Sequence, residues 1–148
     1  MTESIIKFIH DSIDSCDYYT DEAKQEIKSW YYDERQPNII HLRLNDKIIC
    51  AVALDDCGSM VNTLPKTFTV WVEWLAVAQE YRNKGIAKIL IGEVEKYAKE
   101  IDSKSVSADI RVGNEAIISV LDKMGYERLY VHESYFKEQD YEIWRKEL

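Results

Sequence analysis

The sequence predicts a single α+β domain that spans residues 1–148. Three observations support this fold class. Apolar residues recur at helical spacing from Gly85 to Ile101. The segment 67–77 is long, rich in β-branched and aromatic residues, and apolar on both faces, as expected of a strand in the middle of a sheet. Helical and strand patterns follow one another without a linker, an internal repeat or a low-complexity segment.

The chain begins with two predicted helices, over 3–16 and 21–32. Isoleucine recurs every four residues in the first, from Ile5 to Ile13. Thr20 precedes the second, where its side chain is suited to cap the helix N-terminus.

A hairpin of strands 39–44 and 47–54 is predicted next, around the turn pair Asn45-Asp46. The segment 55–66 contains Gly, Pro and Asn and has no period, so we interpret it as a loop. The remaining predicted elements are strand 67–77, helix 85–101, strand 105–112, helix 114–124, and strands 126–133 and 141–148.

Composition excludes several classes of partner. Nineteen basic and 27 acidic residues give a net charge of −8, which argues against nucleic acid and against an anionic membrane. This balance suits a cationic substrate, although a negative surface that keeps the protein dissolved explains it as well. The three cysteines show no CxxC spacing and no nearby His pair, so neither a disulfide nor a metal site is expected. Without a signal-peptide pattern or a membrane-length apolar run, a cytoplasmic protein is expected.

The turn between strand 67–77 and helix 85–101 has the features of an anion site. The first N–H groups of a helix have no partner inside it, and the helix dipole adds to their positive field. Gly85 allows the backbone to approach an anion closely, and Arg82 and Lys84 add charge. Each cation taken alone is equally well explained as a solvated loop residue.

This turn resembles the coenzyme A loop of the GNAT superfamily of N-acyltransferases. The loop has the form (Q/R)-x-x-G-x-(G/A), which Arg82, Gly85 and Ala87 match. A Glu four residues before the end of the preceding strand, Glu73 before Val77, is a second shared feature.

Two further features strengthen the resemblance. Asn114 begins the next short helix, and the pair Gly125-Tyr126 follows eleven residues later. The resemblance implies a GNAT-like α/β sandwich with a mixed, mostly antiparallel central sheet flanked by helices. Its first strand is short or missing here, because only Met1 to Ser4 precede the first helix. This thin edge favours a homodimer.

The resemblance implies an N-acetyltransferase that transfers the acetyl group of acetyl-CoA to a primary amine of a small molecule or peptide by direct attack. An acyl-CoA-binding sensor or interaction module with weak catalysis is the alternative. The strands around 67–77 and 105–112 are implied to part and admit the pantetheine arm. The implied coenzyme-binding residues are Leu75, Ala76, Val77, Arg82, Asn83, Lys84, Gly85, Ile86, Ala87 and Asn114. Asn114 is equally suited to cap its helix.

Glu73 is the candidate general base. Strand alternation predicts that residues 71, 73, 75 and 77 share a face, and burial of a carboxylate there would raise its pKa. The alternative is a structural carboxylate paired with Arg43 or Arg111.

The residue expected to act as general acid differs from the family pattern. Family members often carry a Tyr seven residues after the Asn, and this position is Leu121. Tyr126 is the candidate replacement, and Tyr130, Tyr135, water or the newly formed ammonium are the alternatives.

Aromatic residues are concentrated in the first two predicted helices, at Tyr18, Tyr19, Trp30, Tyr31 and Tyr32. They either pack on the sheet, as we expect for Trp30, or receive a cationic acceptor. Trp71 and Trp74 are predicted on opposite faces of their strand, with Trp71 beside Glu73 at the substrate site.

Overall fold

The computed structural model of the chain describes residues 4–32, 38–55, 69–136 and 138–148. Apart from Asp55, the predicted loop 55–66 lies outside these residues, as does the predicted start of the strand at 67 and 68. The other predicted elements fall within them, except for residue 3 at the start of the first predicted helix.

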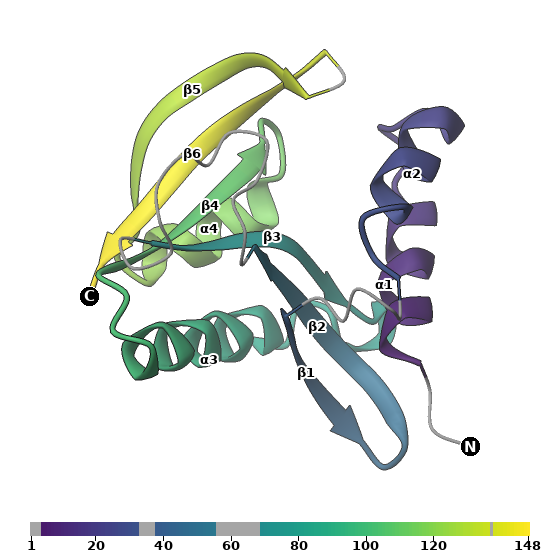
Figure 1. Cartoon of the computed structure of the whole chain (residues 1–148), viewed down its shortest axis with the longest axis horizontal. Helices are drawn as coiled ribbons and strands as arrows, with labels where there is room; N and C mark the ends of the chain where they lie inside the picture. The colour runs from purple at the N-terminus through teal and green to yellow at the C-terminus, as the bar shows by residue number, and fades with distance from the viewer. Residues whose placement is uncertain (1–3, 33–37, 56–68, 137) are drawn as a thin grey trace.

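Six strands form one sheet in the order β1-β2-β3-β4-β6-β5. They are β1 (Asn38–Leu44), β2 (Lys47–Asp55), β3 (Val70–Val77), β4 (Ser105–Arg111), β5 (Glu127–Phe136) and β6 (Gln139–Glu147). β3 and β4 run parallel, and the other neighbours are antiparallel. The predicted α+β class with a mixed, mostly antiparallel sheet is confirmed (Figure 1).

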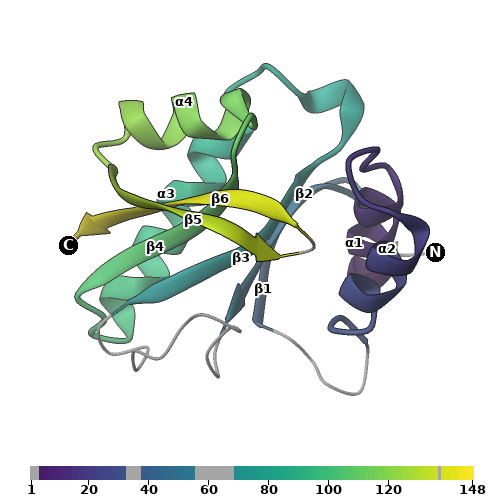
Figure 2. The ribbon, with the colours of Figure 1, turned by 90° about the horizontal axis from the view of Figure 1, so that it is seen from above.

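In the described part of the chain, four α-helices flank the sheet. They are α1 (Ile5–Asp14), α2 (Asp21–Lys28), α3 (Ile86–Glu100) and α4 (Glu115–Lys123), with a short 3-10 helix at Gln79–Tyr81. The N-cap predicted at Thr20 is confirmed, because its side chain accepts the N–H of Ala23 at 3.1 Å. In Figure 2, α1 and α2 lie together, away from α3 and α4.

Two apolar clusters hold these helices to the sheet. The α3 cluster consists of Cys50, Val52, Leu54, Val70, Val72, Leu90, Ile91, Val94, Ala98, Val106, Ala108, Ile110, Leu121, Tyr126 and Trp144. The N-terminal cluster consists of Ile9, Ile13, Tyr19, Ala23, Ile27, Tyr31, Ala51, Ala53, Phe136 and Tyr141. Each fully buried Leu, Ile or Val contributes about 1.5–3 kcal/mol to folding.

β3 contains a β-bulge at Glu73, which the sequence did not predict. The pairing with β2 passes from Val72, opposite Leu54, directly to Trp74, opposite Ala53. A bulge reverses the alternation of side chains beyond it. Val72 and Leu75 therefore both pack in the α3 cluster, whereas Trp74 packs against the N-terminal cluster.

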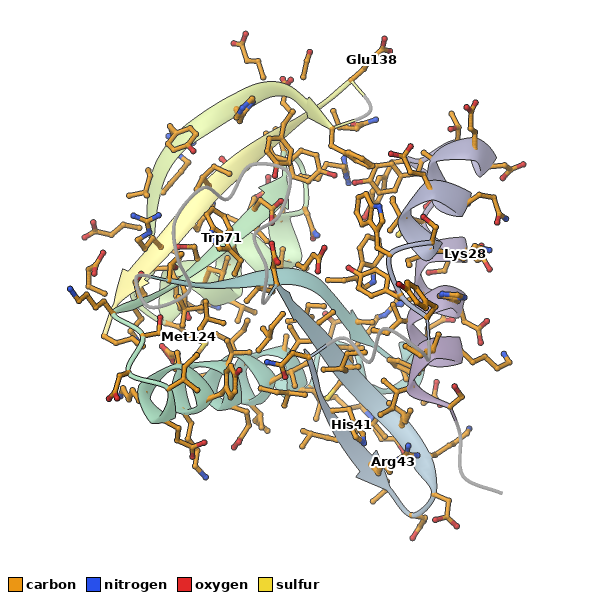
Figure 3. All side chains as sticks on the ribbon, in the orientation of Figure 1. Lys28, His41, Arg43, Trp71, Met124 and Glu138 are labelled. Atoms are coloured by element: carbon orange, nitrogen blue, oxygen red, sulfur yellow. The ribbon has the colours of Figure 1, made fainter. Side chains whose placement is uncertain are left out.

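The bulge corrects two predictions about faces. Residues 71, 73, 75 and 77 do not share one face of β3. Trp71 precedes Val72, which packs in the α3 cluster, so Trp71 lies on the opposite side of the sheet, where Trp74 also packs. The prediction that Trp71 and Trp74 lie on opposite faces is therefore wrong. Figure 3 shows Trp71 across β3 from Met124, which packs against the α3 cluster.

The closing hairpin is longer than predicted. β5 continues to Phe136 and β6 starts at Gln139, so the strands are joined more tightly than the predicted ends at 133 and 141 imply. An irregular stretch between His132 and Phe136 allows this extension, because the N–H of Ser134 is satisfied by the Asp140 carboxylate at 2.8 Å instead of by the ladder. The extension brings Phe136 to the N-terminal cluster.

Replacement of Thr20 by Ala removes the N-terminal cap of α2. We expect the free energy of unfolding to fall by about 1 kcal/mol, measured by urea denaturation. Thr20→Ser keeps the acceptor oxygen and is expected to retain most of the stability. Equal losses in the two variants would contradict a capping role.

Candidate active site

β3 and β4 part in the middle of the sheet. Their ladder comprises the pairs from Val70–Val106 to Val72–Ala108. Beyond it, β3 stays paired with β2 as far as Val77, and β4 stays paired with β6 as far as Arg111. The facing edges of the two strands are therefore open beyond Val72 and Ala108. We call this opening the fork, and it confirms the predicted parting of the strands.

A cavity of about 970 Å³ lies at the fork. Its wall includes residues 15–19, 72–77, 85–88, 108–111 and 113–117, together with Ser12, Ile27, Trp30, Tyr81, Arg82, Asn83, Ile91, Val120, Leu121, Tyr135, Phe136 and Tyr141. The cavity thus joins the fork to the N-termini of α3 and α4. Its other side is formed by the α1–α2 segment and the β5–β6 hairpin.

One end of the cavity is formed by the turn before α3. Gly85 precedes α3 in the left-handed conformation, with φ 79°, and Asn83 has φ 62°. Within the described residues, no acceptor receives the N–H groups of residues 83–88. These groups gather at the positive end of a 15-residue helix. Such a turn fits a pyrophosphate.

The side chains of the two predicted cations, Arg82 and Lys84, make different contacts. Arg82 Nε donates to the carbonyl of Val77 at 3.0 Å and ties the turn to the end of β3. Lys84 lies over the Tyr81 ring, 5.9 Å from its centroid, and does not line the cavity. The backbone of the turn is therefore better placed than the Lys84 side chain to hold an anion.

Leu75, Ala76 and Val77 all line the cavity along β3. Leu75 and Val77 lie on the α3 side of the sheet and Ala76 faces the other way, as the bulge dictates. Together they form one wall of the fork.

Glu73 and Asp109 meet where the fork begins. Glu73 is the bulged residue of β3, and Asp109 follows the last paired residue of β4. Both line the cavity. Burial, together with the smaller effect of the negative charges of Glu73 and Asp55, raises the pKa of Asp109 to about 7, although a backbone hydrogen bond and a hydrogen bond from Tyr135 act to lower it.

Sequence reasoning did not single out Asp109. The signal was present, because Asp109 is the one acidic residue of the strand predicted over 105–112. The argument applied to Glu73, that a carboxylate on a largely apolar strand needs a reason, applies equally to it.

Aromatic side chains enclose the side of the cavity opposite α3. Tyr19 and Tyr141 are buried, and their hydroxyls hydrogen-bond to one another. Tyr18 stacks under the Arg111 guanidinium at 3.7 Å. Trp30 packs as expected, against the N-terminal cluster, and also lines the cavity. These contacts tie the α1–α2 segment to the C-terminal hairpin and to β4.

Comparison with known proteins agrees with this geometry. A sequence profile of the acetyltransferase (GNAT) family matches residues 6–126. The chain belongs to the GNAT acetyltransferase family. The family consists of transferases.

Solved structures of GNAT proteins share the fold. The ribosomal-protein-S18-alanine N-acetyltransferase from Escherichia coli aligns with a TM-score of 0.72 and 11% identity, over 99% of this chain and 91% of that one. Ribosomal-protein-alanine N-acetyltransferase from Brucella melitensis aligns with a TM-score of 0.73 and 15% identity, over 97% of this chain and 92% of that one. The protein yncA from Salmonella typhimurium was solved with its cofactor acetyl-CoA. It aligns with a TM-score of 0.71 and 15% identity, over 97% of this chain and 86% of that one. No match was found among curated protein sequences.

Asn114 stands at the N-cap position of α4, yet its side chain makes no capping hydrogen bond. It lines the cavity. The predicted side-chain cap is therefore not formed, and the predicted contact with the coenzyme stays a prediction. Leu121, at the position where GNAT enzymes often carry a Tyr, is fully buried and also lines the cavity.

The structure does not bring Tyr126 to the site. Its ring is buried in the α3 cluster and is not part of the cavity wall. Burial, together with the charge of Glu95, raises the pKa of its hydroxyl far above the usual range. Of the alternatives, Tyr130 is exposed outside the cavity, whereas Tyr135 lines it.

No helix in the described part of the chain is both long and apolar enough to cross a membrane.

Gly85→Ala tests the turn before α3. A Cβ at Gly85 meets no protein atom within 4 Å, so the variant is expected to fold, but the left-handed backbone is strained for Ala. We expect the Kd for coenzyme A, measured by calorimetry, to rise about tenfold or more as the N–H groups lose their alignment.

Gly92→Ala is the matched control, because Gly92 lies inside α3 with no atom near its added Cβ and no positive φ. It is expected to leave coenzyme A binding unchanged. Equal affinities in both variants would show that the turn does not hold the coenzyme.

Proposed function

We propose that the protein transfers the acetyl group of acetyl-CoA to a primary amine by direct attack. The observation that carries this proposal is that one cavity joins the fork to the open N–H groups of residues 83–88. The amide groups of a pantetheine arm fit open strand edges, and a pyrophosphate fits a helix N-terminus. The two features lie in the order in which coenzyme A presents these groups.

The backbone at the end of β3 supplies a donor for the thioester oxygen. Ala78 donates its N–H to the Ile49 carbonyl on β2 at 2.8 Å. Successive N–H groups of a strand point to opposite edges, so the N–H of Val77 is directed into the fork. There it stabilises the oxyanion that forms when the amine attacks.

A carboxylate at the base of the fork makes the amine reactive. An ammonium group must lose a proton before its nitrogen can attack. Glu73 occupies the general-base position of the family motif and lines the cavity. We propose that its negative charge draws the ammonium in and assists loss of the proton.

The leaving thiolate must be protonated without the usual Tyr. Leu121 has no proton to donate, and Tyr126 lies outside the cavity wall. The nitrogen of the tetrahedral intermediate still carries an acidic proton after attack, so we propose that this proton passes to sulfur.

We propose a primary amine of a small molecule or peptide as the acceptor, entering as a cation. The carboxylates of Glu73 and Asp109 and the aromatic wall around Tyr18 support a cation. The names of the E. coli and B. melitensis relatives support a peptide amine.

A second candidate function is acyl-CoA binding without efficient catalysis, in a sensor or interaction module. Leu121 favours it, because the expected proton donor is missing. A thiol-release assay over a panel of amines separates the two functions, since a sensor binds the coenzyme but releases no thiol.

We further propose that the protein acts in the cytoplasm, without nucleic acid, membrane or metal, and that it forms a homodimer. The net charge of −8 and the sequence patterns described above support these proposals.

Acetyl-CoA at about 100 times its Kd is expected to raise the melting temperature by about 5 °C or more. Absence of a thermal shift with any acyl-CoA would refute the proposed function.

Glu73→Gln is expected to lower kcat/KM about tenfold or more while leaving the Kd for acetyl-CoA unchanged.

A further inference from the structure

Asp109 occupies a position at the fork that the family motif does not assign. It is the first residue of β4 beyond the ladder with β3, and its side chain lines the cavity. It lies opposite Ile143 on β6, which is 1% exposed, and two residues before Arg111, which lies opposite Tyr141. Because opposed residues share a face, Asp109 faces the aromatic side of the cavity.

We propose that Asp109 is the carboxylate that receives the proton of the acceptor amine, while Glu73 beside it supplies the charge that attracts the ammonium. This inference rests on the proposed acetyl transfer and assigns the proton to a residue outside the family motif.

The groups that act on the Asp109 carboxylate come from three other strands. Glu73 on β3 and Asp55 on β2 act on it as negative charges, and the Tyr135 hydroxyl on β5 donates a hydrogen bond to its carboxylate. The cations on this face are held elsewhere. The Arg111 guanidinium stacks on Tyr18 and donates to the carbonyl of Val112.

The next cation along the face is also engaged. Arg145 on β6 donates from Nε to the hydroxyl of Ser107 at 2.9 Å. Asp109 therefore lies among carboxylates and a tyrosine at the start of the fork.

This setting makes Asp109 an effective proton acceptor. With its pKa raised to about 7, the carboxyl is partly ionised at neutral pH and binds a proton far more strongly than an exposed Asp. A base whose pKa lies near the working pH combines a useful ionised fraction with a strong pull on the proton.

The proton and electron balance is complete with these groups. The ammonium gives one proton to the Asp109 carboxylate, and the freed nitrogen lone pair forms the N–C bond. The C–S bond then breaks with its electron pair on sulfur, which takes a second proton from the nitrogen. The products are the acetamide, the thiol and a protonated Asp109, which returns its proton to water.

The pH dependence of kcat/KM tests the assignment. The ionised carboxylate is the active form, so activity of the wild type is expected to rise through an apparent pKa of about 7. Asp109→Asn, which keeps the side-chain shape, is expected to lower kcat about 100-fold or more. It is also expected to remove this rise of activity with pH, which we call the acid limb of the pH profile. Acetyl-CoA affinity and circular dichroism, both unchanged, would show that the variant is folded.

Substitutions of two residues next to Asp109 are expected to shift the acid limb of the pH profile in opposite directions. Glu73→Gln removes a negative charge that raises the pKa of Asp109, so the limb shifts to lower pH. Tyr135→Phe removes a hydrogen bond that lowers this pKa, so the limb shifts to higher pH. Asp122→Asn, at an exposed position of α4 outside the cavity wall, is the control and is expected to shift nothing.

Stability provides a readout that needs no acceptor amine. Because its pKa is 3.8 in the unfolded chain and about 7 in the folded one, Asp109 binds more proton in the folded protein between these values. Its contribution to the free energy of unfolding is therefore lost as pH rises from about 4 to 7. Asp109→Asn is expected to raise the urea midpoint relative to wild type progressively over this range.

The outcomes separate the two proposals. Wild-type turnover with an unchanged profile in Asp109→Asn would overturn the role of Asp109 and leave acetyl transfer standing. Thiol release by no amine would overturn both, even if the urea midpoints showed that Asp109 titrates as expected.

Discussion

The parting of β3 and β4 is the constraint on which the rest of the site depends. A backbone edge in the middle of a sheet leaves polar groups that need partners. β3 and β4 satisfy this need on their outer edges only, through β2 and β6, so the fork offers its inner edges to a ligand. The turn before α3 continues the same pattern, because the N–H groups of residues 83–88 lie open at the end of β3. The proposed recognition of the coenzyme thus rests mainly on backbone groups.

Much of the fold could be predicted from the sequence because its signals are local. Helical spacing in 86–100, the cap at Thr20 and the Gly at position 85 depend on a few neighbouring residues. The order of the elements followed from the same patterns. The turn before α3 was predicted correctly because a positive φ favours Gly and a helix start has open N–H groups.

The parts that sequence reasoning missed depend on contacts between distant segments. The bulge at Glu73 is a matter of register between β2 and β3, and no residue of β3 alone reports it. The environment of Asp109 is built from β2, β3 and β5. Tyr126 was chosen by its order along the chain, whereas its burial in the α3 cluster is set by packing. The residues proposed for the chemistry can therefore be found only with the tertiary structure, whereas most of the proposed phosphate site lies in one continuous segment of the sequence.

Backbone amide chemical shifts on titration with acetyl-CoA test the central claim most directly, because the claim concerns backbone groups. The account predicts that the largest shifts in a ¹⁵N correlation spectrum fall on residues 83–88 and on the fork residues of β3 and β4. The exposed residues Leu129 to Val131 of β5, outside the cavity wall, should remain unchanged. Large shifts confined to other surfaces, with the amides of residues 83–88 unmoved at saturation, would contradict it.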